Sequence, residues 1–125
     1  MALSEVSRGA AFGDIDNDGD MDIVINNNNG PARLLLNQSA AGGHWLMVDV
    51  AGRAPGTRVG VFLPGGRALW RRVHTDGSYL SASDPRVHFG LGAATSVEKI
   101  EVRWPDGFTK TFGPSPADRI VRLSR

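Results

Sequence analysis

Five aspartates lie within nine residues near the start of the chain, in the run Asp14-Ile15-Asp16-Asn17-Asp18-Gly19-Asp20-Met21-Asp22. Carboxylates at this density repel one another unless a cation lies among them. Hard oxygen ligands with no His or Cys nearby favour Ca²⁺, with Mg²⁺ or Mn²⁺ as alternatives, over Zn²⁺ or copper. Gly19 permits a sharp turn. The sequence therefore predicts a Ca²⁺ site with the ligands Asp14, Asp16, Asp18, Asp20 and Asp22, of which Asp20 can offer its carbonyl oxygen and Asp22 closes the shell.

The residues around this loop exclude an EF-hand. Position 12 of an EF-hand loop carries a bidentate Glu, but the twelfth residue counted from Asp14 is Ile25. The β-branched run Ile23-Val24-Ile25 favours a strand, and the segment from Asn26 to Gly30 that follows favours a turn. We therefore expect the acidic loop to join two strands. The alternative is a solvated acidic turn that binds no metal.

Composition narrows the class of protein. The chain has 125 residues, 41% hydrophobic and 22% charged, with a net charge of +1 and no cysteine. These values are typical of one small soluble domain, without disulfides and without an apolar run that could span a membrane. The arginines are scattered, which argues against nucleic-acid binding. Residues 1–6 lack the basic and apolar regions of a signal peptide.

The strand pattern predicts an all-β fold, an antiparallel β-sandwich or flattened barrel with an N-terminal calcium-loop strand pair. Residues 1–38 form the calcium-loop segment and residues 44–125 a β domain, packed as one unit. Pro64-Gly65-Gly66 and Pro105-Asp106-Gly107 are typical of hairpin turns. The expected strands are 22–26, 33–37, 45–51, 57–63, 67–75, 86–90, 97–104, 109–112 and 119–123.

Catalytic constellations are weak. Serines, aspartates and His74 are close in sequence between residues 74 and 84, but no strained Gly-x-Ser-x-Gly turn surrounds them. We therefore do not expect an enzyme. Aromatic residues offer a different possibility, because flat rings bind pyranose faces. Trp104, Tyr79 and Trp70, with Arg103 as a hydrogen-bond donor, are the candidate glycan-binding residues. The alternative, which the sequence favours for each ring taken singly, is that these aromatics fill the core. Trp104, at a strand end before a turn, and Tyr79, in a Gly-Ser turn, are the first candidates for exposure.

Two segments resemble known families. The segment from Gly13 to Ile25, within residues 9–37, resembles an FG-GAP (VCBS-type) calcium repeat. Residues 44–123 resemble the ASPIC/UnbV domain, through His44-Trp45-Leu46, Gly77-Ser78-Tyr79-Leu80-Ser81, His88-Phe89-Gly90-Leu91-Gly92 and Glu101-Val102-Arg103-Trp104-Pro105-Asp106-Gly107. The resemblance implies a non-catalytic β module of a secreted or cell-surface protein, with calcium ligands at Asp14, Asp16, Asp18 and Asp22.

Two functions follow as hypotheses. The first is a module for recognition or adhesion in which calcium is a structural staple; the second is a carbohydrate-binding module that uses exposed Trp or Tyr. The expected partner is a glycan or a protein surface. Only one acidic motif is present, so residues 1–38 must bury their apolar face against something else. Unpaired strand edges there would favour a homodimer.

Overall fold

The structure is a computed structural model that describes residues 4–39 and 42–125. The described residues form strands, turns and irregular segments without an α-helix, so the predicted all-β class is confirmed. No helix in these residues has the length and apolarity to cross a bilayer. The described chain divides into two compact units: residues 4–39 with 75–84 form unit 1, and residues 42–74 with 85–125 form unit 2.

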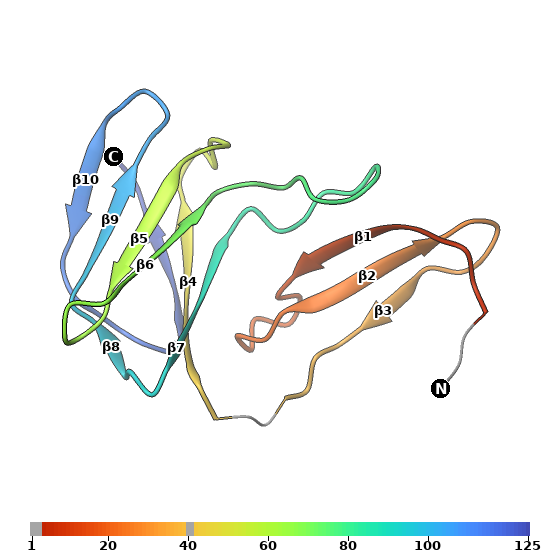
Figure 1. The fold of residues 1–125 in the computed structure, drawn as a ribbon, viewed down its shortest axis with the longest axis horizontal. Helices are drawn as coiled ribbons and strands as arrows, with labels where there is room; N and C mark the ends of the chain where they lie inside the picture. The colour runs from red at the N-terminus through yellow and green to blue at the C-terminus, as the bar shows by residue number, and fades with distance from the viewer. Residues whose placement is uncertain (1–3, 40–41) are drawn as a thin grey trace. The chain divides into compact units, whose positions relative to one another are not determined.

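Unit 1 contains an antiparallel sheet of three strands in the order β1-β2-β3 (Figure 1). The strands are β1 (Ser7–Gly13), β2 (Asp22–Asn27) and β3 (Arg33–Leu35). The acidic loop connects β1 to β2, so the prediction that it joins two strands is confirmed. Among the described residues of this unit, no hydrophobic side chain is fully buried. Polar contacts therefore contribute more to this sheet than an apolar core does.

The segment 75–84 belongs to unit 1 although it lies between two strands of unit 2 in the sequence. It covers the outer edge of β1. The Ser78 Oγ accepts a hydrogen bond from the Ala10 amide (2.9 Å), and the Ser83 Oγ accepts one from the Phe12 amide (3.2 Å). The Asp84 amide donates to the Phe12 carbonyl (2.8 Å). These bonds satisfy backbone groups that an unpaired edge strand would leave open to another chain.

Unit 2 contains two larger sheets, in the orders β10-β9-β5-β6 and β12-β4-β7, and a short β11-β8 pair (Figure 1). Alternating Val and Ile residues of both sheets point into one apolar core that includes Leu46, Val61, Phe89 and Val102, each at most 1% exposed. This arrangement is consistent with the predicted β-sandwich. The strands are β4 (His44–Val50), β5 (Arg58–Phe62), β6 (Ala68–Arg72), β7 (Val87–Gly92), β8 (Ser96–Val97), β9 (Lys99–Arg103), β10 (Thr109–Phe112), β11 (Ser115–Pro116) and β12 (Arg119–Leu123).

Local turn chemistry predicted both hairpins correctly. Gly65 and Gly66 have φ of 94° and 91° between the antiparallel strands β5 and β6, and Gly107 has φ of 90° between β9 and β10. Positive φ is the backbone region that glycine adopts without a steric penalty. The side chains of β5 and β9 alternate between the two faces of the larger sheet.

Several strand predictions differ from the structure. The expected strands did not include β1 or β11, and the strand expected at 33–37 ends at Leu35. β12 pairs with β4 in parallel, which departs from an entirely antiparallel fold. The single strand expected at 97–104 is wrong, because β8 pairs with β11 whereas β9 pairs with β5, so the chain changes partner near Glu98. The strand expected at 67–75 ends at Arg72, and Thr75 already belongs to unit 1.

Candidate metal centre

The loop between β1 and β2 brings three of the predicted ligands together. Carboxylate oxygens of Asp14, Asp16 and Asp18 lie within 4.8 Å of one another. Asp14 is 2% exposed, whereas Asp16 and Asp18 are exposed. Gly19 has φ of 95°, so the predicted sharp turn is present at that residue. A hard divalent cation accepts ligands of this type at about 2.3–2.6 Å, a geometry that small side-chain movements can reach from this arrangement.

Asp14 organises the turn by accepting backbone hydrogen bonds. Its two oxygens accept from the amides of Asp18 (3.1 Å) and Gly19 (2.9 Å). The Asp18 Oδ1 in turn accepts from the Asp20 amide (2.9 Å). Such bonds are stronger than neutral ones because the acceptor is charged. The loop is therefore held in shape by the same carboxylates that converge at its centre.

Asp22 has a different place in the loop from the three converging residues. It is 1% exposed, and its oxygens accept from the amides of Ile15 (2.9 Å) and Asn37 (2.8 Å). These bonds connect the start of the loop and the segment after β3 to the start of β2. Asp20 is half-buried and, like Asp22, lies outside the converging group. As direct ligands, both stay predictions.

The electrostatics of the loop favour a cation. Partial removal from water raises the pKa of Asp16, and repulsion from Asp18 and Asp22 raises it further. A raised carboxyl pKa means that the charged form is disfavoured in the folded loop. A divalent cation would favour the charged form instead, because its attraction for each carboxylate offsets the repulsion between the carboxylates. The arrangement can thus convert an unfavourable charge cluster into a favourable one.

A second polar network, which sequence reasoning missed, fixes the opposite end of the sheet. Glu5 accepts hydrogen bonds from Arg33 Nη2 (2.6 Å) and from Asn27 Nδ2 (2.9 Å). The Arg33 guanidinium lowers the pKa of the Glu5 carboxyl, and Glu5 raises the pKa of Arg33. Asn27, 6% exposed, also donates to the Pro31 carbonyl and accepts from the Ser7 hydroxyl. Nothing in the local sequence marked Glu5, because its partners are 22 and 28 residues away.

The predicted aromatic residues lie in different units and differ in exposure. For Trp104 the core alternative holds: its side chain is 6% exposed and joins the core of unit 2. The hairpin places Phe108 5.4 Å from the Trp104 ring, centroid to centroid, and the Arg125 guanidinium carbon lies 5.1 Å from the Trp104 centroid. A ring covered on this scale has no free face for a sugar. Tyr79, the other candidate for exposure, is 69% exposed and lies in unit 1.

Trp70 and Arg103 do come together, on the outer face of the larger sheet of unit 2. The Arg103 guanidinium carbon lies 4.4 Å from the Trp70 ring centroid, and that of Arg58 lies 5.4 Å away. The ring lies against Gly60, where an added Cβ would be 2.7 Å from ring atoms. Arg103 also donates to Glu101 (2.6 Å). Trp70 is thus partly covered by its own neighbours, through cation–π contacts.

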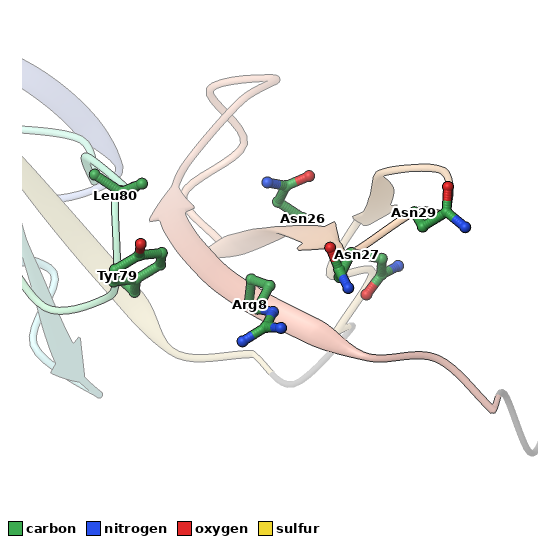
Figure 2. Close-up of a pocket in the computed structure, with 7 residues that line it drawn as sticks. Arg8, Asn26, Asn27, Asn29, Tyr79 and Leu80 are labelled. Atoms are coloured by element: carbon green, nitrogen blue, oxygen red, sulfur yellow. The ribbon is translucent and has the colours of Figure 1, made fainter.

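Unit 1 also has an open cavity of about 470 Å³ that the sequence did not reveal (Figure 2). The asparagines Asn26 to Asn29 are expected in a turn, but in the structure Asn26 and Asn27 belong to β2 and the turn follows them, with a φ of 54° at Asn29. Their amides also line this cavity. No local pattern connects them with the remaining lining residues, because the segment 75–84 is distant in sequence. The cavity is lined by Arg8, Asn26, Asn27, Asn28, Asn29, Tyr79 and Leu80.

Comparison with known families agrees with the resemblance in the second part of the chain. Residues 51–125 match the ASPIC and UnbV family, so the chain belongs to this family. The matched range includes the segment 75–84, which lies in unit 1 in this structure.

Similar curated proteins extend the likeness towards the first residues. Cartilage acidic protein 1 of Xenopus tropicalis is 25% identical over 130 residues, which cover 93% of this chain and 19% of that protein. Cartilage acidic protein 1 of Mus musculus and of Homo sapiens are each 28% identical over 111 residues, covering 79% of this chain and 16% of those proteins. This chain therefore spans less than a fifth of the length of these relatives.

Proposed function

We propose that this chain is a non-catalytic recognition or adhesion module of a secreted or cell-surface protein, and that Ca²⁺ acts as its structural staple. The observation that carries the proposal is the convergence of Asp14, Asp16 and Asp18 within 4.8 Å in a loop whose shape is held by backbone amides. Membership of the ASPIC and UnbV family is compatible with this role.

Calcium matters more for unit 1 than it would for a domain with a large core. The described residues of this unit contain no fully buried hydrophobic side chain. A cation that binds only the folded loop adds RT ln(1 + [L]/Kd), about 2.7 kcal/mol at a hundredfold excess over Kd. In this proposal one bound Ca²⁺ fixes the connection between β1 and β2. This is the role expected of the FG-GAP-type calcium repeat that the acidic segment resembles in sequence.

The test is thermal unfolding of the full chain in EGTA and in millimolar Ca²⁺, with Mg²⁺ and Mn²⁺ as parallel arms. At about 4 °C per kcal/mol for a chain of this size, we expect Ca²⁺ to raise the Tm by about 10 °C. Asp16→Asn should abolish this rise without lowering the Tm in EGTA, because it removes a charge that its neighbours repel. Glu98→Gln, an exposed residue of unit 2, is the matched control and should keep the full response. A Tm that is the same in EGTA and in all three cations contradicts the proposal.

Carbohydrate binding is the second candidate, and the exposed ring of Tyr79 is the observation that favours it. Trp104 lies in the core and the Trp70 ring is partly covered by Arg58 and Arg103, so Tyr79 is the exposed ring among the three candidates.

A further inference from the structure

The cavity in unit 1 has an exposed, strained tip on one side. Tyr79 and Leu80 are 69% and 89% exposed, and Leu80 has φ of 47°. A branched, non-glycine residue in the left-handed region costs energy, and such strain concentrates where a side chain is presented to a ligand. In the view of Figure 2, Arg8 lies between this tip and Asn27.

The base of the tip is fixed to β1, so the exposed side chains are held in place. The Ser81 amide donates to the Ser78 carbonyl (3.3 Å), and the Ala10 amide donates to the Ser78 Oγ (2.9 Å). Gly9 permits the approach: a Cβ there would lie 2.5 Å from the Tyr79 carbonyl oxygen. The lack of a side chain at Gly9 therefore sets how closely the tip packs against the strand.

The polar groups of the cavity are available to a ligand. Arg8 and the asparagines Asn26, Asn28 and Asn29 are exposed, and within residues 4–39 and 42–125 none of these side chains forms an ion pair or a side-chain hydrogen bond. Asn27 is different, because its side chain is used by Glu5, Ser7 and Pro31. Arg8 is also the only charged residue of the lining.

From this combination we infer that the cavity binds a glycan residue that carries a carboxylate, such as a uronic acid. This inference rests on the recognition role proposed above and names its ligand class. A guanidinium pairs with a carboxylate through two parallel hydrogen bonds. Asparagine amides both donate and accept, which matches sugar hydroxyls, and the Tyr79 ring offers a flat apolar face to a pyranose. A volume of about 470 Å³ lies within the range of small-ligand sites.

An acidic peptide is the competing ligand, and the lining favours the sugar. A peptide with several carboxylates gains from several cations, but this cavity has only Arg8. Three free amides beside one guanidinium match one carboxylate surrounded by hydroxyl groups.

The test is an NMR titration of the full, Ca²⁺-loaded chain with methyl β-D-glucuronide, methyl β-D-glucoside and an acetylated tetra-aspartate peptide. We expect the glucuronide to shift the amide signals of Arg8, Asn28 and Leu80, with an affinity at least tenfold higher than that of the glucoside, since a charge-assisted pair is worth about that factor. Absence of shifts with the glucuronide overturns the inference. Tighter binding of the peptide than of the glucuronide also overturns it, in favour of an acidic protein partner.

Matched variants separate the parts of the site. Arg8→Gln should reduce glucuronide affinity about tenfold and remove the preference over the glucoside, whereas Arg67→Gln, an exposed arginine of unit 2, should change neither. Tyr79→Ala should weaken both sugars, and Tyr79→Phe should retain them. Unchanged binding in both Arg8→Gln and Tyr79→Ala refutes the site. The Ca²⁺ effect on Tm is measured separately. A failed glucuronide titration therefore does not contradict the calcium proposal, and an unchanged Tm does not contradict the glucuronide site.

Discussion

The place of Asp22 in the loop leads to a prediction that separates structural carboxylates from metal ligands. Asp22→Asn keeps the size of the side chain but removes its charge and replaces one acceptor oxygen with an NH₂ group. In the structure both oxygens accept, from the amides of Ile15 and Asn37, and the residue is 1% exposed. One of these two amides must therefore face a second donor in the variant.

The cost follows from these two hydrogen bonds. A hydrogen bond to a charged acceptor is worth about 1.5–3 kcal/mol. Both bonds are only partly buried, so water can reach the amide that loses its partner. One bond is lost and the other weakens, and we expect Asp22→Asn to reduce the free energy of unfolding of unit 1 by about 1.5–3 kcal/mol. This loss should be present in EGTA, because it does not involve the cation.

Amide hydrogen exchange measures this loss where it occurs. We expect faster exchange of the Ile15 and Asn37 amides in Asp22→Asn, together with a lower urea midpoint for signals of unit 1, in EGTA and in Ca²⁺ alike. Asp20→Asn removes the same charge from the same loop without removing a bond to these two amides, so it is the control and should leave their exchange unchanged. If Asp22→Asn is silent in EGTA and weakens only Ca²⁺ binding, Asp22 is a ligand and the reasoning is wrong.

Two further predictions concern other contacts. Gly60→Ala should lower the free energy of unfolding by about 1–3 kcal/mol in urea, because the new methyl group would lie 2.7 Å from Trp70 ring atoms; a wild-type midpoint would mean that the ring moves away freely. Arg33 lowers the pKa of Glu5, so this pair stabilises the fold above the ordinary glutamate pKa of about 4.3, and the contribution is lost as pH falls through the lowered value. The Tm of Glu5→Gln should therefore fall less than that of the wild type between about pH 6 and pH 3, and parallel curves would contradict this reasoning.

Local patterns in the sequence predicted local structure well. The alternation of Val59 and Val61 on β5, and the glycines of both hairpin turns, follow from interactions within a few residues, and the structure agrees. The acidic loop is also a local feature, which explains why the convergence of Asp14, Asp16 and Asp18 could be expected from spacing alone.

Features that depend on distant partners were missed. The sequence favours the core for Trp104 but leaves exposure open because the residue precedes a turn; Arg125, from the last residues of the chain, lies over its ring, and local sequence does not indicate this contact. The parallel pairing of β12 with β4 joins strands separated by most of unit 2. The Ser78 and Ser83 hydroxyls bind β1 amides 68 and 71 residues away, and no periodicity in either segment indicates these bonds.

The discontinuity of unit 1 has a consequence for synthesis on the ribosome. Residues 4–39 emerge before the segment 75–84, so Ser78, Ser83 and Asp84 have to follow before the outer edge of β1 acquires its hydrogen bonds. Until then the nascent sheet presents bare amides to any neighbouring nascent chain. The acidic loop is complete about sixty residues before the protective segment, so Ca²⁺ bound there would hold β1 and β2 together during this interval while the outer edge of β1 stays open.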